Sequence, residues 1–235
     1  MRIKLQHDFL QRFPEASVHA LVYEDVDRVT AAIAERWRMR AQAHVRAMDI
    51  SPDRLIEREE IQEWRKAYSQ FGLKPSKYRS SIEQLWKRAV QGNVIQTPVP
   101  LVNLYCFASI LSGAPMGGYD LDHVSGDLYV RLARGNEQFT GIGEKQPAHV
   151  PAGVVVYGDD SSVLCYGWNY RDAACSALRA ETRRAIFFAD SAEARSRGRA
   201  ASAMTLLREA LDDAGATYKA SAILSAENNE ADVVN

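Results

Sequence analysis

The stretch of sequence that decides the fold lies between residues 74 and 182 and opens with P-S-K-Y-R-S-S-I-E-Q-L-W-K-R-A-V-Q-G, residues 75–92. Within this opening segment, Ser80 and Glu83 have the spacing of a capping box, in which two side chains bond the free backbone N–H groups of the first helical turn. Gly92 is the residue type that commonly follows the end of a helix. The segment therefore predicts a helix between Ser80 and Gly92.

Four further segments follow in order along the same stretch. They are V-N-L-Y-C-F-A-S-I (102–110), P-M-G-G-Y-D (115–120), G-D-L-Y-V-R-L-A (126–133) and W-N-Y-R-D (168–172). Their order resembles the B3/B4 domain of the bacterial phenylalanyl-tRNA synthetase β subunit, and more closely the free-standing B3/B4 proteins that exist without a synthetase. In the synthetase this domain hydrolyses tRNA charged with the wrong amino acid. The resemblance therefore implies an aminoacyl-tRNA, or the acceptor end of tRNA, as the partner.

The apolar pattern of the whole chain predicts helices first and strands later. Helices are expected over 29–48, 54–70, 80–91, 102–111 and 192–214, and strands over 16–23, 128–132, 154–157, 163–168, 185–188 and 218–224. Helices grouped before a run of strands favour an α+β fold over the regular alternation of a doubly wound sheet. We expect one B3/B4-like α+β domain of mostly antiparallel strands packed with helices over residues 1–225, and a flexible tail over 226–235.

Composition narrows the possible partners and cofactors. The 235 residues carry 29 basic and 30 acidic side chains, so no overall positive field attracts nucleic acid and any RNA binding must come from a local patch. The three cysteines lack C-x-x-C spacing, the five histidines lack ligand-like pairing, and no apolar run approaches the length of a membrane span. We expect a cytoplasmic protein without metal or other cofactor, and neither a membrane nor DNA as a partner. The sequence leaves the oligomeric state open.

P-M-G-G-Y-D is the most specific local motif. Gly117 and Gly118 allow unusual backbone conformations and a close approach of a ligand to the main chain. Tyr119 offers a ring for stacking, and Asp120 offers a fixed acceptor. The alternative is a tight structural turn whose aspartate caps the next segment.

W-N-Y-R-D follows a predicted strand that ends at Trp168. Alternation along an extended chain would project Asn169 and Arg171 toward one side, where an amide and a guanidinium together suit an adenosine or a phosphate. The alternative is an ion pair from Arg171 to Asp172 or Glu137 that ties two strands together.

Four single residues complete the candidate site. Glu137 begins the second strand of a predicted hairpin, where the family has the pattern A-x-x-G-E-x-F, and the alternative is a structural acceptor for turn amides. Thr182 offers a hydroxyl to a substrate or is simply a strand former. Asn103 stands where the synthetase pattern has the aspartate of D-x-x-N, and Cys106, with apolar neighbours and no nearby histidine, is expected in the core.

The leading hypothesis is a free-standing deacylase that hydrolyses mischarged tRNA in trans. An aminoacyl ester is already activated, so a water oriented by Glu137 or Asp172 and backbone donors from Gly117 and Gly118 would suffice. The synthetase has a histidine before its F-D pair where this chain has glycines before Tyr119, which motivates the alternative of a non-catalytic module that binds tRNA or an amino acid. A small-molecule enzyme that has reused the pocket is the third possibility.

The cation sets that could contact RNA are Arg36, Arg38 and Arg40; Lys74, Lys77 and Arg79; and Arg195, Arg197 and Arg199.

Overall fold

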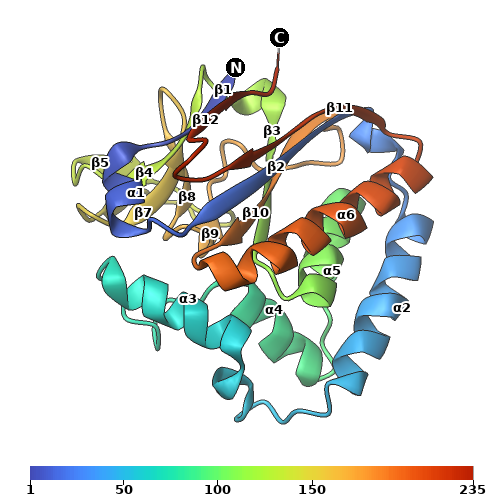
Figure 1. Cartoon of the computed structure of the whole chain (residues 1–235). Helices are drawn as coiled ribbons and strands as arrows, with labels where there is room; N and C mark the ends of the chain where they lie inside the picture. The colour runs from blue at the N-terminus through green and yellow to red at the C-terminus, as the bar shows by residue number, and fades with distance from the viewer. Residues whose placement is uncertain (235) are drawn as a thin grey trace.

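The computed structural model describes residues 1–234, which form two β-sheets, a separate hairpin and a group of helices (Figure 1). The strands are β1 (Arg2–Leu5), β2 (Ser17–Glu24), β3 (Met116–Asp120), β4 (Leu128–Leu132), β5 (Glu137–Phe139), β6 (Ala148–Val150), β7 (Val155–Gly158), β8 (Val163–Tyr166), β9 (Arg171–Asp172), β10 (Arg184–Ser191), β11 (Thr217–Leu224) and β12 (Glu230–Asp232). The helices are α1 (His7–Arg12), α2 (Ala31–Ala47), α3 (Glu59–Gln70), α4 (Ser81–Val90), α5 (Pro100–Ser112) and α6 (Arg197–Asp213). The predicted α+β class is confirmed.

One sheet has four strands in the order β11-β2-β10-β3, and all its pairs are antiparallel. The other has six strands in the order β12-β1-β4-β7-β8-β9, in which β1 and β4 form the one parallel pair among the described residues. Strands β5 and β6 pair only with each other. The sheets are therefore mostly antiparallel, as the sequence predicts.

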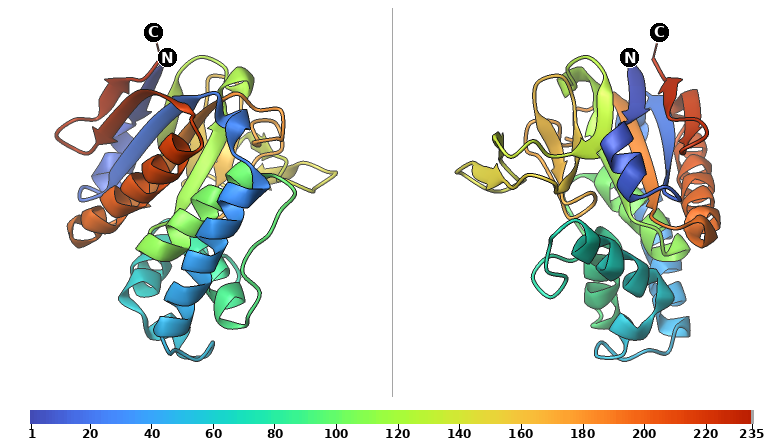
Figure 2. Two further views of the ribbon diagram at one scale, coloured as in Figure 1. Left: turned by 90° about the vertical axis from the view of Figure 1, so that its right-hand side faces the viewer. Right: turned by 60° about the vertical axis from the view of Figure 1, so that its left-hand side comes forward.

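The four-stranded sheet lies between helices α5 and α6 on one side and the six-stranded sheet on the other (Figure 2). Helix α6 contacts β2 and β10 on one face, and α5 packs against α6, α2 and β3. Aromatic rings fill the space between the two sheets: Tyr157 of β7 lies 5.0 Å from Phe188 of β10 and 6.0 Å from Tyr119 of β3, measured between ring centroids. Because β10 is buried on both faces, its sequence reads as one apolar run that ends in Asp190.

Local sequence explains where the central helices begin and end. The Ser80 hydroxyl accepts the backbone N–H of Glu83 at the start of α4, as the capping-box spacing predicts. Pro100 occupies the first turn of α5, where its missing N–H costs nothing, and Gly113 ends the helix in the left-handed conformation.

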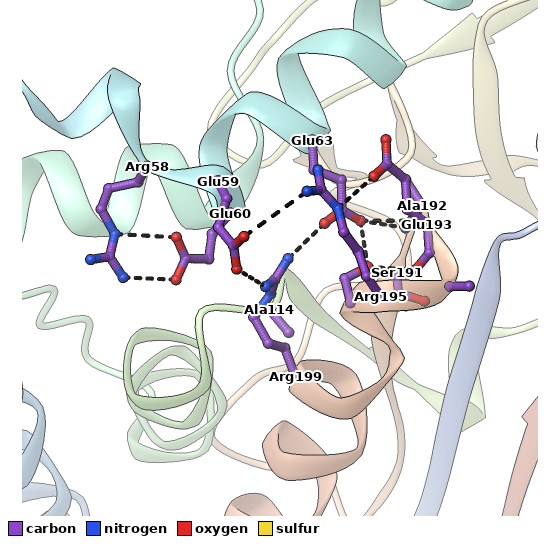
Figure 3. A network of polar contacts seen from close by, with 12 residues as sticks. Arg58, Glu59, Glu60, Glu63, Ala114, Ser191, Ala192, Glu193, Arg195 and Arg199 are labelled. Atoms are coloured by element: carbon purple, nitrogen blue, oxygen red, sulfur yellow. Dashed lines mark hydrogen bonds and ion pairs between the residues drawn. The ribbon is translucent and has the colours of Figure 1, made fainter.

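Helix α3 is joined to the start of α6 by the buried carboxylate of Glu63 (Figure 3). This carboxylate accepts the backbone N–H groups of Ala192 and Glu193 at 2.9 and 3.2 Å, the Ser196 hydroxyl at 2.5 Å and the Arg199 guanidinium at 2.8 Å. These bonds fix the chain directly after β10, and with it the carboxyl end of that strand.

The larger differences from the sequence prediction concern two helix starts, one strand end and the tail. The expected helix over 54–70 begins as an α-helix only at Glu59, and the helix expected from 192 begins at Arg197 after a 3-10 turn. The strand expected over 163–168 stops at Tyr166. The expected flexible tail instead contributes β12, which pairs with β1 through main-chain hydrogen bonds, while Asn235 lies outside the described residues.

No helix within residues 1–234 combines the length and the apolar character needed to cross a membrane.

Candidate functional site

A small cavity of about 100 Å³ lies between the two sheets, beside the first residue of α4. It is lined by residues of β3, β7, β8, β9 and β10 and of the turn before β9, namely Ser81, Met116, Gly117, Tyr119, Tyr157, Cys165, Trp168, Asn169, Tyr170, Arg171, Asp172, Phe188 and Asp190. Five of the ten site residues predicted from the sequence are among them: Gly117, Tyr119, Asn169, Arg171 and Asp172.

Asp172 lies on β9 opposite Cys165 of β8. Burial of its carboxyl raises the pKa of Asp172 to about 6, and a hydrogen bond with Cys165 opposes that rise. Within residues 1–234, no lysine or arginine pairs with this carboxyl. Asp172 therefore offers a carboxylate of raised basicity to the cavity.

Asp190, at the end of β10, is a second buried carboxyl that the sequence analysis missed. Burial raises the pKa of Asp190 to about 7, while hydrogen bonds from the Tyr157 hydroxyl and from Asn169 Nδ2 at 3.3 Å act in the opposite direction. The nearby charge of Asp172 raises the pKa of Asp190 further. The sequence carried a usable signal, namely an acidic residue in an apolar row: strand alternation puts Asp190 on the same face of β10 as Phe188 and Ile186.

Asn169 and Arg171 both line the cavity, but their side chains differ in burial and in their partners. Gly167 and Trp168 both have a left-handed backbone conformation, with φ of 70° and 64°, so the strand ends at Tyr166 and the alternation is broken. Asn169 is buried, and its Oδ1 accepts the Tyr68 hydroxyl at 3.0 Å. Arg171 is exposed and pairs with Glu144, so the expected ion pair with Asp172 or Glu137 is not formed.

The indole of Trp168 holds this turn in place. Its ring centroid lies 4.9 Å from those of Phe9 and Phe13 and 5.0 Å from that of Trp64. Such edge-on aromatic contacts stabilise the left-handed residue and the turn that follows it. Helices α1 and α3 thus help to position one wall of the cavity.

Glu137 lies away from the cavity, at the start of β5. Its carboxylate pairs with Arg131 at 2.5 Å and accepts the backbone N–H of Arg134 at 2.7 Å. Hydrogen bonds from these two groups lower the pKa of Glu137, although burial alone would raise it. The structure thus places Glu137 as an acceptor for a turn amide, which was the alternative interpretation of the sequence.

Asp120 and Thr182 bond to each other outside the cavity. The Thr182 hydroxyl donates to Asp120 at 2.7 Å and accepts the backbone N–H of Arg179 at 2.9 Å. Asp120 also accepts the N–H of Asp122, as the capping interpretation of P-M-G-G-Y-D predicts. The pair therefore fixes the segment that leads into β10.

Three more predictions have structural outcomes. Gly118 packs in the core, where an added Cβ would lie 2.8 Å from the Phe187 ring. Asn103 is buried and bonds both backbone groups of Thr97 with its side-chain amide. Cys106 is buried as expected, and burial raises the pKa of its thiol to about 12. Across residues 1–234, no group of three His, Cys, Asp or Glu side chains is arranged to hold a metal ion.

Comparisons with known proteins give one family and one fold. The family model described as the B3/4 domain matches residues 63–212. Among solved structures, an N-terminal fragment of the phenylalanyl-tRNA synthetase β subunit from Pyrococcus horikoshii aligns with a TM-score of 0.50 at 12% identity, covering 92% of this chain and 49% of the fragment. The chain thus spans about half of that fragment, and the likeness concerns the fold. No curated protein matches the chain.

Proposed function

The chain belongs to the B3/4 domain family, and on that basis we propose that it is an aminoacyl-tRNA deacylase, which hydrolyses the ester of a mischarged tRNA in trans at the cavity between the two sheets. The observation that carries the proposal is the pair of carboxyls, Asp172 and Asp190, that line this cavity and that form no ion pair within residues 1–234. Carboxyls with pKa values shifted by burial cluster at catalytic sites.

Asp172 acts as the general base. Water adds its oxygen to the ester carbonyl carbon while its proton passes to the Asp172 carboxylate. The bond from that carbon to the ribose oxygen then breaks, and the ribose oxygen takes a proton as it leaves, which gives free amino acid and tRNA. A base with a pKa of about 6 is mostly ionised at neutral pH and yet more basic than an ordinary aspartate.

Gly117 leaves room for the ester beside this base. A Cβ at position 117 would lie 3.8 Å from the Asp172 Oδ1, so the absent side chain opens the space next to the carboxylate. Tyr119 and Arg171 are further proposed substrate contacts, because both line the same cavity. Asp190 has a role through Asn169, whose amide donates to it and which also lines the cavity.

A panel of correctly and incorrectly charged tRNAs tests the proposal. We expect selective release by the wild type, and a loss of at least about 100-fold in rate for Asp172→Asn, in line with the contribution of a general base. Asp213→Asn is the matched control, since Asp213 is exposed at the end of α6 and pairs only with Arg36. The same rate in Asp172→Asn and wild type contradicts the assignment of the base.

The pH dependence gives a second readout of the same assignment. The rate is expected to rise with pH through about 6 and then level off, because the base must be ionised to accept the proton. A rate that is flat from pH 5 to pH 8 would contradict Asp172 as the base.

A non-catalytic module of the same fold is the second candidate. None of the five histidines of the chain is among the residues that line the cavity, so the arrangement offers no histidine for proton transfer. Tight retention of aminoacyl-tRNA, with the ester left intact by the wild type, would favour this candidate over the deacylase.

A further inference from the structure

Four aromatic rings form a continuous cluster that adjoins the cavity through Tyr170. The centroid of the Tyr78 ring lies 5.3 Å from that of Tyr170 and 5.9 Å from that of Tyr166. Tyr166 in turn lies 6.0 Å from Tyr170 and 5.8 Å from Phe139 of β5. Tyr170 also lines the cavity that holds Asp172, so the cluster and the candidate catalytic carboxyl share one rim.

The cluster has a buried layer and a partly exposed layer. Tyr166 and Phe139 are buried on the sheet, whereas Tyr78 and Tyr170 are partly exposed. Buried rings beneath exposed ones restrict the rotamers of the outer rings, so the outer surface is ordered before any ligand arrives. Partly exposed, ordered aromatic rings are the surfaces on which proteins stack the unpaired bases of single-stranded nucleic acid.

Within residues 1–234, every cation of the first and third sets that the sequence singled out has a partner in the protein, whereas two lysines of the second set, next to Tyr78 in the chain, have none. On α2, each of the three arginines of the first set is paired with an acid: Arg36 with Asp213, Arg38 with Glu35 and Arg40 with Glu209. In the third set, Arg195 and Arg199 pair with glutamates of α3 and Arg197 donates to the carbonyl of Glu15.

The second set differs from these two in its two lysines, while its third member, Arg79, pairs with Glu83. Within residues 1–234, no acidic side chain lies within ion-pair distance of Lys74 or Lys77, and both side chains are exposed. The ammonium of Lys77 lies 5.3 Å from the centroid of the Tyr78 ring. The Lys77 ammonium therefore lies next to a partly exposed ring, and Lys74 is fixed one turn before it, since its carbonyl accepts the backbone N–H groups of Lys77 and Tyr78. The net charge of the protein, -1, gives no general attraction for a polyanion.

We propose that Tyr78 and Tyr170 form a stacking platform for the unpaired bases at the 3′ end of an RNA strand, whose phosphates contact Lys74 and Lys77. The identification of the strand as the 3′ end of a tRNA rests on the proposed function, because the platform adjoins the cavity where the ester is hydrolysed. The rings bind the face of any base, and the lysines bind the backbone, so the platform accepts the strand with little preference for sequence. An acidic peptide would use the lysines alone and leave the rings without a ligand group to stack.

Binding of a short RNA, without any charged amino acid, tests the platform apart from catalysis. The probe is a fluorescein-labelled single-stranded RNA of eight nucleotides that ends in CCA, and its affinity is measured by anisotropy over a range of salt concentrations. The variants are Tyr78→Ala, Tyr78→Phe, Lys77→Gln and, as the control, Asp213→Asn, each checked for folding by its thermal unfolding curve. A blunt RNA duplex of the same length is the second probe.

The platform predicts a different result for each variant. Tyr78→Ala should weaken binding about tenfold, while Tyr78→Phe keeps the ring and should bind like the wild type. Lys77→Gln should weaken binding and reduce the slope of log K against log salt by about 0.7, the value for one lost phosphate contact on a single strand. Asp213→Asn should bind normally, because Asp213 is exposed at the end of α6, pairs with Arg36, and belongs neither to the cavity nor to the ring cluster.

Three outcomes would overturn the platform: no binding of the single strand by the wild type, equal affinity of Tyr78→Ala and wild type, or a preference for the duplex. Each of these leaves the deacylation assay with the Asp172 variant as an independent result. Conversely, binding that depends on Tyr78 in a protein that hydrolyses no aminoacyl-tRNA would support the platform and contradict the proposed function.

Discussion

Two regions of this molecule bury acidic side chains, and they treat them in opposite ways. Glu63 of α3 is buried with four donors around its carboxylate, one of them the guanidinium of Arg199 (Figure 3). Asp190 is buried and Asp172 is partly buried, both with neutral partners and, within residues 1–234, without a paired cation. A buried charge that is neutralised and fully bonded holds a structure together, whereas one that lacks a cation keeps its affinity for a proton.

The two regions are linked by the strand β10. Asp190 ends the strand on the cavity side, and the residues that follow, Ala192 and Glu193, donate their backbone N–H groups to Glu63. The bonds at Glu63 therefore fix the chain end that would otherwise move away from an uncompensated carboxyl. In this view the satisfied carboxylate offsets part of the cost of the unsatisfied pair.

The largest expected effect in this comparison is the loss of the charge at Glu63. Glu63→Gln removes the partner of Arg199 and puts an amide donor against backbone donors, so we expect a fall of about 4 kcal/mol in the free energy of unfolding. Urea unfolding at pH 7 measures it. Glu59→Gln is the control, because that exposed carboxylate also pairs with Arg199 and should cost less than about 1 kcal/mol. Similar losses of unfolding free energy in the two variants would mean that the burial of Glu63 does not determine its contribution to stability.

The second effect has the opposite sign and comes from Asp190. A rise of the pKa of Asp190 from 3.8 to about 7 corresponds to roughly 4 kcal/mol of destabilisation of the folded state once the group is ionised. Replacement by asparagine removes this destabilisation but loses one hydrogen bond, which costs about 1 kcal/mol. Asp190→Asn should therefore be roughly 3 kcal/mol more stable than wild type above pH 7.

This gain should vanish at low pH, and the sign follows from proton binding. Below about pH 4 the carboxyl is protonated in both the folded and the unfolded state. Between about pH 4 and 7 only the unfolded state ionises, so the wild type loses stability as the pH rises. Unfolding curves of the wild type and of Asp190→Asn at pH 4, 6 and 8 test this. A wild type that becomes more stable relative to Asp190→Asn as the pH rises would contradict the raised pKa.

The sequence predicted the fold well because the fold depends on patterns that are local. The cap at Ser80, the proline and glycine that bound α5 and the apolar run of β10 each act within a few residues. The tail was less predictable, since the pairing of β12 with β1 joins residues more than 220 positions apart and depends on tertiary contacts alone.

The candidate site was predicted in part, for a reason that one residue illustrates. Alternation beyond Trp168 assumes an extended chain, and the left-handed φ of Trp168 sends Asn169 inward and Arg171 outward. That conformation is held by rings from α1 and α3, far away in the sequence. Asp172 was found from the family pattern. Asp190 was missed because the strand predicted over 185–188 ended two residues before it, whereas β10 continues to Ser191.

A smaller effect than those of Glu63 and Asp190 is expected at Tyr157, whose hydroxyl donates to Asp190. Tyr157→Phe removes a hydrogen bond that favours the ionised form, so the pKa of Asp190 should rise above its value of about 7 and the protein should lose about 1 kcal/mol of stability at pH 8. The loss should shrink at pH 4, where Asp190 is protonated. The measurement is urea unfolding at both pH values, and a loss that is equal at the two would separate Tyr157 from the titration of Asp190.

The smallest effect on stability is expected at Gly117, and this variant sharpens the comparison most. The backbone of Gly117 is not left-handed, and a Cβ there would make only an ordinary contact with Asp172 Oδ1 at 3.8 Å, so Gly117→Ala should change the free energy of unfolding by less than about 0.5 kcal/mol. It should nevertheless slow the proposed hydrolysis, because the methyl group occupies the space beside the base. Gly118→Ala is the contrasting neighbour: its Cβ would lie 2.8 Å from the Phe187 ring, and it should destabilise the fold by about 2 kcal/mol. A Gly117→Ala variant that keeps both full stability and full activity would show that the ester does not approach Asp172 across this glycine. The contrast between a structural carboxylate at Glu63 and a catalytic one at Asp172 would then lose its support.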